Sequence, residues 1–231
     1  MKRRGFMEKV ISAGAAGIVL TACSNLSNAQ TVDGKDESKA SKTDQSLKKG
    51  ASKKMKIVVL TGSPRKNGNT NIMATRFIEG ATEAGHEVFR FDCAHQDISP
   101  CIGCNHCNMN GPCIYDDAFT PLRAKLIEAD LVAFVSPMYY FGFSAQLKRV
   151  IDRFYAINGT IKGASKKAVF LMAYADNSKA EAEAMTMHYK TLIRYLGWKD
   201  SGMVIAPGVW TAGSVKNTKY VEEAYQLGKK I

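Results

Sequence analysis

The sequence predicts a doubly wound α/β domain, built on a five-stranded parallel sheet, over residues 55–231. Strand and helix patterns alternate five times along this stretch, and helices of this length are the crossover connections that parallel strands require. The first, third and fourth strand candidates are almost continuous apolar runs, as expected of strands buried on both faces. With 231 residues, of which 45% are hydrophobic, the chain is long enough for one sizeable domain and too short for two.

Each element has its own pattern. Apolar runs predict strands at residues 56–60, 86–91, 131–136, 168–173 and 203–206. Helical periodicity predicts helices near residues 69–84, 117–128, 144–158, 179–196 and 215–230. Ligands of such sheets bind at the carboxyl ends of the strands, so the loops after the strands are the first places to look for a site.

The loop after the first strand, residues 61–70 (TGSPRKNGNT), leads directly into a helix. A strand, turn and helix in this order point backbone N–H groups and a positive helix end at an anion. Gly62 and Gly68 let the backbone approach closely. Small polar side chains for phosphate oxygens are offered by Ser63, Asn69 and Thr70. The loop is neither a Walker motif nor a dinucleotide fingerprint. We interpret it as a phosphate-binding loop, and an ordinary Gly- and Asn-rich loop is the alternative.

An aromatic loop, residues 137–143 (PMYYFGF), follows the third strand. Aromatic side chains just beyond a buried strand can pack against a flat ring system, and Gly142 keeps the backbone close to it. The alternative is a hydrophobic loop that plugs the sheet end or contacts a second subunit. The loop after the fourth strand, residues 173–177, is polar and is expected to line the same crevice.

These motifs carry a resemblance. Residues 62–65 and 68–70, followed by Pro137-x-Tyr139 and residues 144–153 (SAQLKRVIDR), resemble the NADPH-dependent FMN reductase branch of the flavodoxin-like superfamily over about residues 55–231. The resemblance implies a flavodoxin-like fold and FMN as cofactor. The residues that it implies for the FMN phosphate are Ser63, Arg65, Asn69 and Thr70. Those that it implies around the isoalloxazine ring are Pro137, Met138, Tyr139, Tyr140, Phe141 and Gly142.

Four cysteines form a C-x2-C-x2-C-x5-C run between the second strand and the next helix. They are Cys101, Cys104, Cys107 and Cys113. Repeated Cys-x2-Cys spacing turns the sulfurs toward one metal, as in chains that bind a [4Fe–4S] cluster, whereas structural zinc sites more often use two separated pairs. The run also resembles that of iron-sulfur flavoproteins, in which the cluster loop lies near a flavin, often across a dimer interface, so a homo-oligomer is expected. Thiols or disulfides without metal, and zinc, remain alternatives.

Other candidate residues are weaker. Cys93, at the end of the second strand, is interpreted as a small buried apolar residue rather than a ligand. Asp116 and Asp117 are interpreted as capping and dipole charges for the next helix. No Ser/His/Asp or paired-carboxylate arrangement identifies a catalytic residue.

The first 23 residues predict a lipoprotein signal peptide of the twin-arginine type. Their apolar stretch, residues 10–22, is shorter than the roughly 20 residues of a membrane span. Residues 20–23 (LTAC) resemble a lipobox, in which Cys23 is lipidated, and residues 3–9 (RRGFMEK) resemble a twin-arginine export signal. A basic amphipathic helix of the mature protein is the alternative. Residues 24–54 are rich in Ser, Lys and Asp and are expected to form a disordered tether with a reach of about 30 Å.

Charge and location shape the functional prediction. Residues 1–54 carry 11 Lys/Arg and 5 Asp/Glu, and the remainder carries 21 and 16, so the net charge of +11 divides into +6 and +5. No basic stripe interleaved with aromatics follows, so no nucleic-acid partner is expected.

We predict an extracytoplasmic, membrane-anchored FMN oxidoreductase. Its donor is NAD(P)H by resemblance, and a quinol or a redox protein by location. A flavodoxin-like electron carrier with no small-molecule substrate is the alternative.

Overall fold

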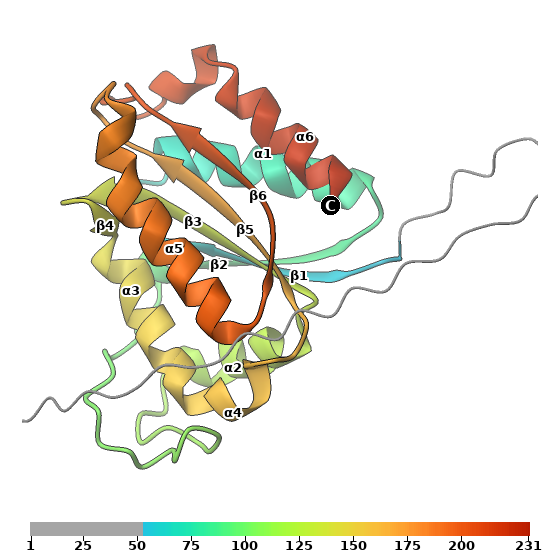
Figure 1. The fold of residues 1–231 in the computed structure, drawn as a ribbon, viewed down its shortest axis with the longest axis vertical. Coiled ribbons are helices and arrows are strands. Elements are labelled where there is room, and N and C mark those ends of the chain that lie inside the picture. The colour runs from blue at the N-terminus through green and yellow to red at the C-terminus, as the bar shows by residue number, and fades with distance from the viewer. Residues whose placement is uncertain (1–52) are drawn as a thin grey trace, which may run out of the picture. The chain divides into compact units, whose positions relative to one another are not determined.

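The computed structural model describes residues 53–231. The predicted signal peptide, the lipidated Cys23 and residues 24–52 of the predicted tether lie outside the described residues. The described part is an α/β domain with helices on both faces of a sheet (Figure 1). No helix within residues 53–231 is both long enough and apolar enough to cross a membrane.

The strands are β1 (Lys56–Thr61), β2 (Glu87–Asp92), β3 (Leu131–Tyr139), β4 (Gly142–Phe143), β5 (Lys167–Ala173) and β6 (Lys199–Ala206). The α-helices are α1 (Asn69–Glu83), α2 (Phe119–Glu128), α3 (Ala145–Asp152), α4 (Asn158–Ile161), α5 (Glu183–Leu196) and α6 (Tyr220–Lys230). Short 3-10 helices are η1 (Cys93–His95), η2 (Arg153–Ile157), η3 (Lys179–Ala182) and η4 (Ser214–Asn217).

The predicted five-stranded parallel sheet is confirmed, with the strand order β2-β1-β3-β5-β6. Strand order reverses between β1 and β3, and this switch point is where ligands bind in flavodoxin-like sheets. The two-residue strand β4 was not predicted. It pairs antiparallel with the end of β3, with Met138 opposite Phe143 and Tyr139 opposite Gly142.

Four helices differ from their predicted bounds. The helix predicted over residues 179–196 begins as η3 and becomes α5 only at Glu183. The helix predicted over residues 144–158 ends as α3 at Asp152 and continues as the tighter η2. The helix predicted from residue 117 begins at Phe119, and the Asp117 carboxylate just before it accepts a hydrogen bond from the Phe119 N–H at 3.0 Å. The last helix starts at Tyr220, after the short η4.

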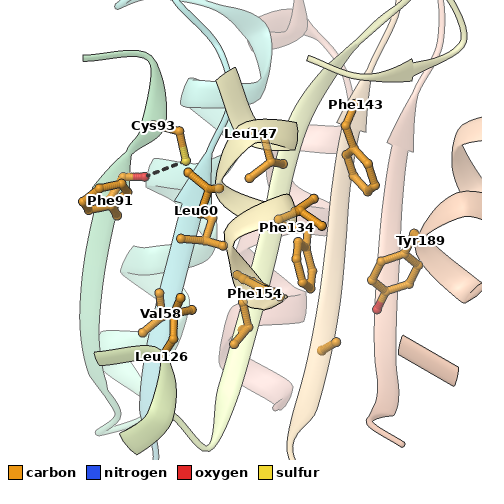
Figure 2. Packing of buried hydrophobic residues seen from close by; sticks show 14 of the residues in the cluster. Val58, Leu60, Phe91, Cys93, Leu126, Phe134, Phe143, Leu147, Phe154 and Tyr189 are labelled. Atoms are coloured by element: carbon orange, nitrogen blue, oxygen red, sulfur yellow. Dashed lines mark hydrogen bonds between the residues drawn. The ribbon is translucent and has the colours of Figure 1, made fainter. Parts of the chain in front are cut away.

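Each face of the sheet has its own hydrophobic core. Val58 and Leu60 of β1 point to the side that α2, α3 and α5 cover, where they pack in one cluster with Phe134 (Figure 2). Ile57 and Val59 point to the other side, which α1 and α6 cover. Because successive residues of a strand face opposite sides, burial on both faces requires an unbroken apolar run, which is what the sequence shows.

Helices α1 and α6 pack backbone against backbone (Figure 1). A Cβ added to Gly80 of α1 would overlap the carbonyl oxygen of Tyr225, and one added to Gly228 of α6 would overlap that of Phe77. These two glycines allow α6 to lie directly on α1, whose N-terminus follows the loop after β1.

Candidate functional site

A cleft of about 540 Å³ opens at the carboxyl ends of β1, β3, β5 and β6, and its size is typical of small-molecule sites. It brings together the two predicted loops. The predicted residues that line it are Ser63, Arg65, Asn69, Thr70, Pro137, Met138, Tyr139 and Tyr140. Phe141 and Gly142 belong to the same hairpin but do not line the cleft. The loop after β5 lines it as expected, through residues 173–175. Val209 and Trp210, after β6, also line it and were not predicted.

The first turn of α1 is open to an anion at one end of this cleft. Within residues 53–231, no side chain caps this helix and its first turn holds no acidic residue, so its leading N–H groups remain available. The hydroxyl of Thr70 is buried and has no hydrogen-bond partner among the described residues. A buried polar group without a partner costs about 1–3 kcal/mol, and a phosphate oxygen would satisfy this one.

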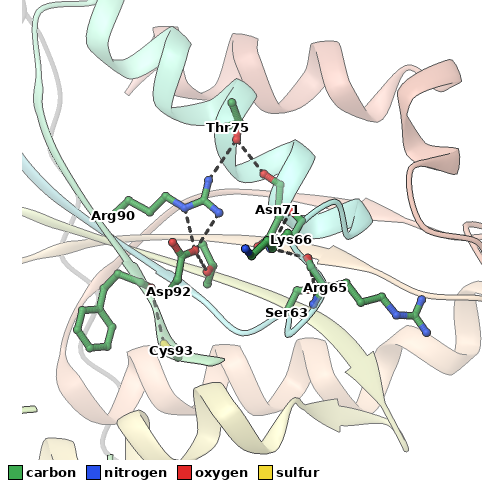
Figure 3. Close-up of polar contacts among 10 residues, drawn as sticks. Ser63, Arg65, Lys66, Asn71, Thr75, Arg90, Asp92 and Cys93 are labelled. Atoms are coloured by element: carbon green, nitrogen blue, oxygen red, sulfur yellow. Dashed lines mark hydrogen bonds and ion pairs between the residues drawn. The ribbon is translucent and has the colours of Figure 1, made fainter. Parts of the chain in front are cut away.

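The loop before α1 is held by its own polar side chains (Figure 3). Asn71 donates from Nδ2 to the carbonyl oxygen of Arg65 at 2.8 Å, and the Ser63 hydroxyl accepts from the Arg65 N–H at 3.3 Å. A Cβ on Gly68 would meet the Ser63 hydroxyl, so this position needs glycine for a close approach. The Arg65 side chain extends away from this cluster and is exposed, which leaves its charge free for a ligand (Figure 3).

A second polar cluster joins β1, β2 and α1 behind the loop. The Thr61 hydroxyl donates to Asp92 Oδ1 at 2.6 Å, and Arg90 contacts both Asp92 and Thr75 (Figure 3). Burial alone would raise the pKa of Asp92, but the hydrogen bonds from Thr61 and Arg90 outweigh it and lower that pKa. The carboxylate therefore stays charged and fixes the end of β2 to the end of β1.

Two serines connect the phosphate loop to the aromatic hairpin. The Ser144 hydroxyl donates to the carbonyl oxygen of Gly62 at 2.8 Å, and the Ser144 N–H donates to the Ser136 hydroxyl at 3.0 Å. A Cβ on Gly62 would overlap the Ser144 hydroxyl, so only glycine permits this contact. The two loops thus share a buried hydrogen-bond network that sets their relative positions.

The aromatic hairpin has a strained tip. Tyr140 and Phe141 connect β3 to β4 with φ values of 44° and 63°, in the left-handed region that favours Gly and Asn. Tyr140 is 100% exposed and Phe141 is 52% exposed. Bulky residues in this conformation each cost about 1–2 kcal/mol. Strain combined with full exposure is typical of residues kept for contact with a ligand or partner.

The four cysteines of the run line one small hollow of about 20 Å³. All four are free thiols; Cys107 is buried, Cys113 is half-buried, and Cys101 and Cys104 are exposed. Within residues 53–231, no three His, Cys, Asp or Glu side chains are close enough to hold a metal ion. The structure therefore gathers the predicted ligands around one point without forming a metal site.

A buried ion pair closes the loop that carries these cysteines. Arg153, only 1% exposed, donates to Asp117 Oδ2 at 2.8 Å and to the carbonyl oxygen of Ser99 at 2.9 Å. Asp117 also accepts from the Ser99 N–H at 3.0 Å. Burial alone would raise the pKa of Asp117, but hydrogen bonds from Arg153, Ser99 and Phe119 outweigh it and lower that pKa. Both ends of the cysteine loop are thus fixed to η2.

Cys93 lies outside this hollow, and its predicted burial is confirmed. It is fully buried between β2 and α3, and burial raises the pKa of its thiol to about 12. The thiol is therefore protonated at neutral pH, whereas metal ligands are thiolates.

Residues 55–214 match the NADPH-dependent FMN reductase family. The chain belongs to this family. An iron-sulfur flavoprotein of Archaeoglobus fulgidus is 33% identical over 179 residues, which cover 77% of this chain and 79% of that protein. An iron-sulfur flavoprotein of Methanocaldococcus jannaschii is 38% identical over 99 residues, but the match spans only 43% of this chain and 51% of that protein.

Solved structures give the same fold for this FMN reductase family member. The NAD(P)H:quinone oxidoreductase of Methanothermobacter marburgensis superposes with a TM-score of 0.61 over 76% of this chain and 95% of that chain, at 20% sequence identity. At this identity the likeness shows the fold alone. Together with the observed strand order, it confirms the predicted flavodoxin-like architecture.

The cleft and the cysteine hollow differ in how well they fit the expected groups. The cleft fits FMN, because an open helix N-terminus and the buried Thr70 hydroxyl lie at the phosphate loop and aromatic side chains lie at the hairpin. The cysteine hollow has the right donors for an iron-sulfur cluster, but its volume is close to that of one water molecule. The four cysteine side chains would have to move relative to one another to hold a cluster, because no three of them within residues 53–231 are placed to bind one metal ion.

Proposed function

We propose that the chain is an FMN-dependent oxidoreductase on the extracytoplasmic face of a bacterial membrane, anchored by a lipid on Cys23. Family membership supports the oxidoreductase and the flavin. The observation that carries the proposal is the cleft in which an uncapped helix N-terminus and an aromatic hairpin meet. The location rests on the signal-peptide pattern of residues 1–23 alone.

The residues of the cleft have separate tasks in this proposal. The leading N–H groups of α1 and the Thr70 hydroxyl bind the phosphate, and Arg65 adds a positive charge. Met138, Tyr139 and Tyr140 contact the ring and exclude water from it. When bound, FMN accepts electrons from a donor and passes them on singly or in pairs, which is chemistry that the side chains themselves do not supply.

The electron donor depends on location. The family suggests NAD(P)H, whereas a tethered extracytoplasmic domain would lack a supply of nicotinamide nucleotides. We therefore propose a membrane quinol or a redox protein as the donor. Steady-state assays with NADPH and with reduced quinone analogues separate these cases. Turnover with the quinol supports the proposal, and brisk turnover with NADPH alone contradicts it. Reversible flavin reduction without turnover of any quinone, nitro or azo compound would identify an electron carrier.

The cysteine loop is proposed to hold a [4Fe–4S] cluster. The spacing of the four cysteines, their shared hollow and the names of the relatives support this. Because the hollow shares no lining residue with the flavin cleft, we also propose a homo-oligomer in which the loop approaches the flavin of a second copy.

Anaerobic purification followed by a visible spectrum, with iron and sulfide analysis, tests both cofactors. Flavin together with about four iron and four sulfide per chain is expected. The variant Cys104→Ser should lose iron and keep flavin, and Cys93→Ser is the matched control that should keep both. Flavin without iron in the wild-type protein would leave the cysteines as thiols or disulfides. A colourless protein would overturn the flavin assignment. Light scattering of the purified protein checks the oligomer.

A further inference from the structure

We infer that Trp210 forms an aromatic wall of the flavin cleft and that Asn69 holds Trp210 in place instead of contacting the phosphate. This inference rests on the proposed FMN site and adds to it a residue outside both sequence motifs. It also changes the role of Asn69, which the family resemblance assigns to the phosphate.

The amide nitrogen and the amide oxygen of Asn69 already have hydrogen-bond partners within the protein. Its Nδ2 donates to the carbonyl oxygens of Val209 and Thr211, each at 2.9 Å, and its Oδ1 accepts from the Val215 N–H at 3.2 Å. A carboxamide has two N–H donors, so neither remains for a phosphate oxygen. These partners also assign the nitrogen and the oxygen of the amide, because two of the partners are carbonyl acceptors and the third is an N–H donor. A longer contact of 3.5 Å from Nδ2 to the Ser214 hydroxyl lies in the same loop.

The residue between the two carbonyls is Trp210. Its backbone is therefore held on both sides, and the neighbouring Val209 is only 6% exposed. The indole, in contrast, is 77% exposed and lines the cleft. A large flat side chain on a fixed backbone loses little conformational entropy when a ring stacks on it, because only its two side-chain torsions have to be ordered.

Tyr140 provides the opposite wall. It lies on the hairpin after β3, and Trp210 lies on the loop after β6, while β5 lies between these two strands in the sheet. Residues 173–175 at the end of β5 line the same cleft. A flat ring seated above the end of β5 would thus have Tyr140 on one side and Trp210 on the other. The loop after β1, which binds the phosphate, is joined to the Trp210 loop through Asn69 itself.

The comparison of FMN with riboflavin, which lacks the phosphate, separates a ring contact from a phosphate contact. We propose to titrate the full chain, in its apo form and with ¹⁵N-labelled tryptophan, with each ligand. The chain has two tryptophans, so the indole N–H region holds two signals, and Trp210→Phe assigns them. Trp198 is an internal reference, because it is buried and its Nε1 donates to the Ile161 carbonyl oxygen at 2.8 Å.

Both ligands should shift the Trp210 signal and leave the Trp198 signal nearly unchanged. Trp210→Ala should raise the dissociation constants of FMN and riboflavin by about tenfold each, and Trp210→Phe, which keeps a stacking ring, should restore most of the affinity. Asn69→Ala should weaken both ligands by a similar factor and broaden the Trp210 signal. Asn217→Ala, an exposed asparagine of η4 that does not line the cleft, is the matched control and should change the affinity for neither ligand.

Three results would overturn the inference in distinguishable ways. Tight FMN binding with an unmoved Trp210 signal would remove Trp210 from the site and leave the proposed function intact. Weakening of FMN but not riboflavin by Asn69→Ala would make Asn69 a phosphate ligand. Failure of the wild-type chain to bind FMN would overturn the proposed function and, with it, the aromatic wall.

Discussion

At the scale of single residues, buried polar atoms without a hydrogen-bond partner mark the candidate site. The Asn71 side chain near the cleft is half paired, because its Nδ2 donates to the carbonyl oxygen of Arg65 while its buried Oδ1 has no hydrogen-bond partner among residues 53–231. Thr70 is 1% exposed, and its hydroxyl has no hydrogen-bond partner among residues 53–231. Because evolution rarely leaves a buried hydroxyl unpaired, this atom is the strongest local sign of a ligand oxygen.

Thr70→Val tests this directly, because valine keeps the shape and removes the hydroxyl. We expect the dissociation constant of FMN to rise about tenfold, which corresponds to one hydrogen bond to a charged group, while riboflavin binding stays unchanged. Isothermal titration with both ligands gives the two constants. Thr82→Val, at the exposed end of the same helix, is the control. Equal losses for both ligands would place the hydroxyl away from the phosphate.

Asp117 and Arg153 make a pH-dependent contribution to stability. The pKa of Asp117 is lowered in the folded state, so its stabilisation is complete above the unfolded pKa of about 3.9 and is lost as pH falls through the lower folded value. Asp117→Asn should lower the free energy of unfolding at pH 7 by about 3–5 kcal/mol, since a buried guanidinium loses its counter-charge.

Urea unfolding between pH 2 and pH 7 measures this contribution. The difference between the wild-type protein and Asp117→Asn should begin to shrink below about pH 4, where the carboxylate of the unfolded chain takes up a proton, and should be lost as pH falls through the lower pKa of the folded state. Asp97→Asn, exposed in the same loop, should behave as wild type at every pH. A difference that does not change with pH would mean that packing, and not charge, fixes the cysteine loop.

Among the elements, the β3–β4 hairpin has a geometry that its sequence disfavours. A two-residue turn with both φ values positive is normally made by Asn-Gly, and here Tyr140 and Phe141 occupy it. Replacing both residues with Asn-Gly should raise the free energy of unfolding by about 1–2 kcal/mol, and the melting temperature by several degrees, while weakening FMN binding. Phe141→Gly alone should stabilise the protein without a loss of affinity, because Phe141 does not line the cleft. Thermal melts give the melting temperatures of both variants, and flavin titrations give their affinities. An Asn-Gly variant less stable than the wild-type protein would contradict the proposed backbone strain at residues 140 and 141.

Most strands were predictable from their apolar runs, and the largest error lies in one edge strand. The central strands read as apolar runs, so β1 and β5 were placed within one residue of their observed ends. Strand β6 begins at Lys199, four residues before its prediction, because an edge strand leaves one side open and tolerates polar residues there. The helix predicted over residues 144–158 changes to η2 at Arg153, which pairs with Asp117, and periodicity does not encode such a distant partner.

At the scale of the whole molecule, the two loops of the candidate site could be predicted from the sequence, and the segment after β6 could not. The loops after β1 and β3 carry local motifs, and the parallel sheet necessarily brings them to one edge. Trp210 was missed because its place depends on Asn69, more than a hundred residues earlier in the chain. An exposed tryptophan after the last strand was the available signal, but exposure is not visible in a sequence. The metal centre predicted from the cysteine spacing stays a prediction.

Export is tested at the other end of the chain. Arg3→Lys combined with Arg4→Lys should leave flavin-loaded protein in the cytosol, because a twin-arginine route accepts folded proteins and depends on this pair. Fractionation with flavin fluorescence of each fraction measures it. Cys23→Ala is the companion variant, and it should be exported but released from the membrane. Normal export of the double-lysine variant would contradict the route.

The contact of α1 with α6 makes the phosphate end of the cleft depend on residues far along the chain. Gly80 and Gly228 allow α6 to cover α1, the helix whose N-terminus faces the phosphate. Without residues 209–230, α1 would lose the helix that covers it, and Asn69 would lose its hydrogen-bond partners at residues 209–215. Domains fold as units, so the candidate site forms only together with residues 209–230. Under the proposed function, FMN therefore binds only after residues 209–230 have folded, and under the proposed twin-arginine route this binding precedes export.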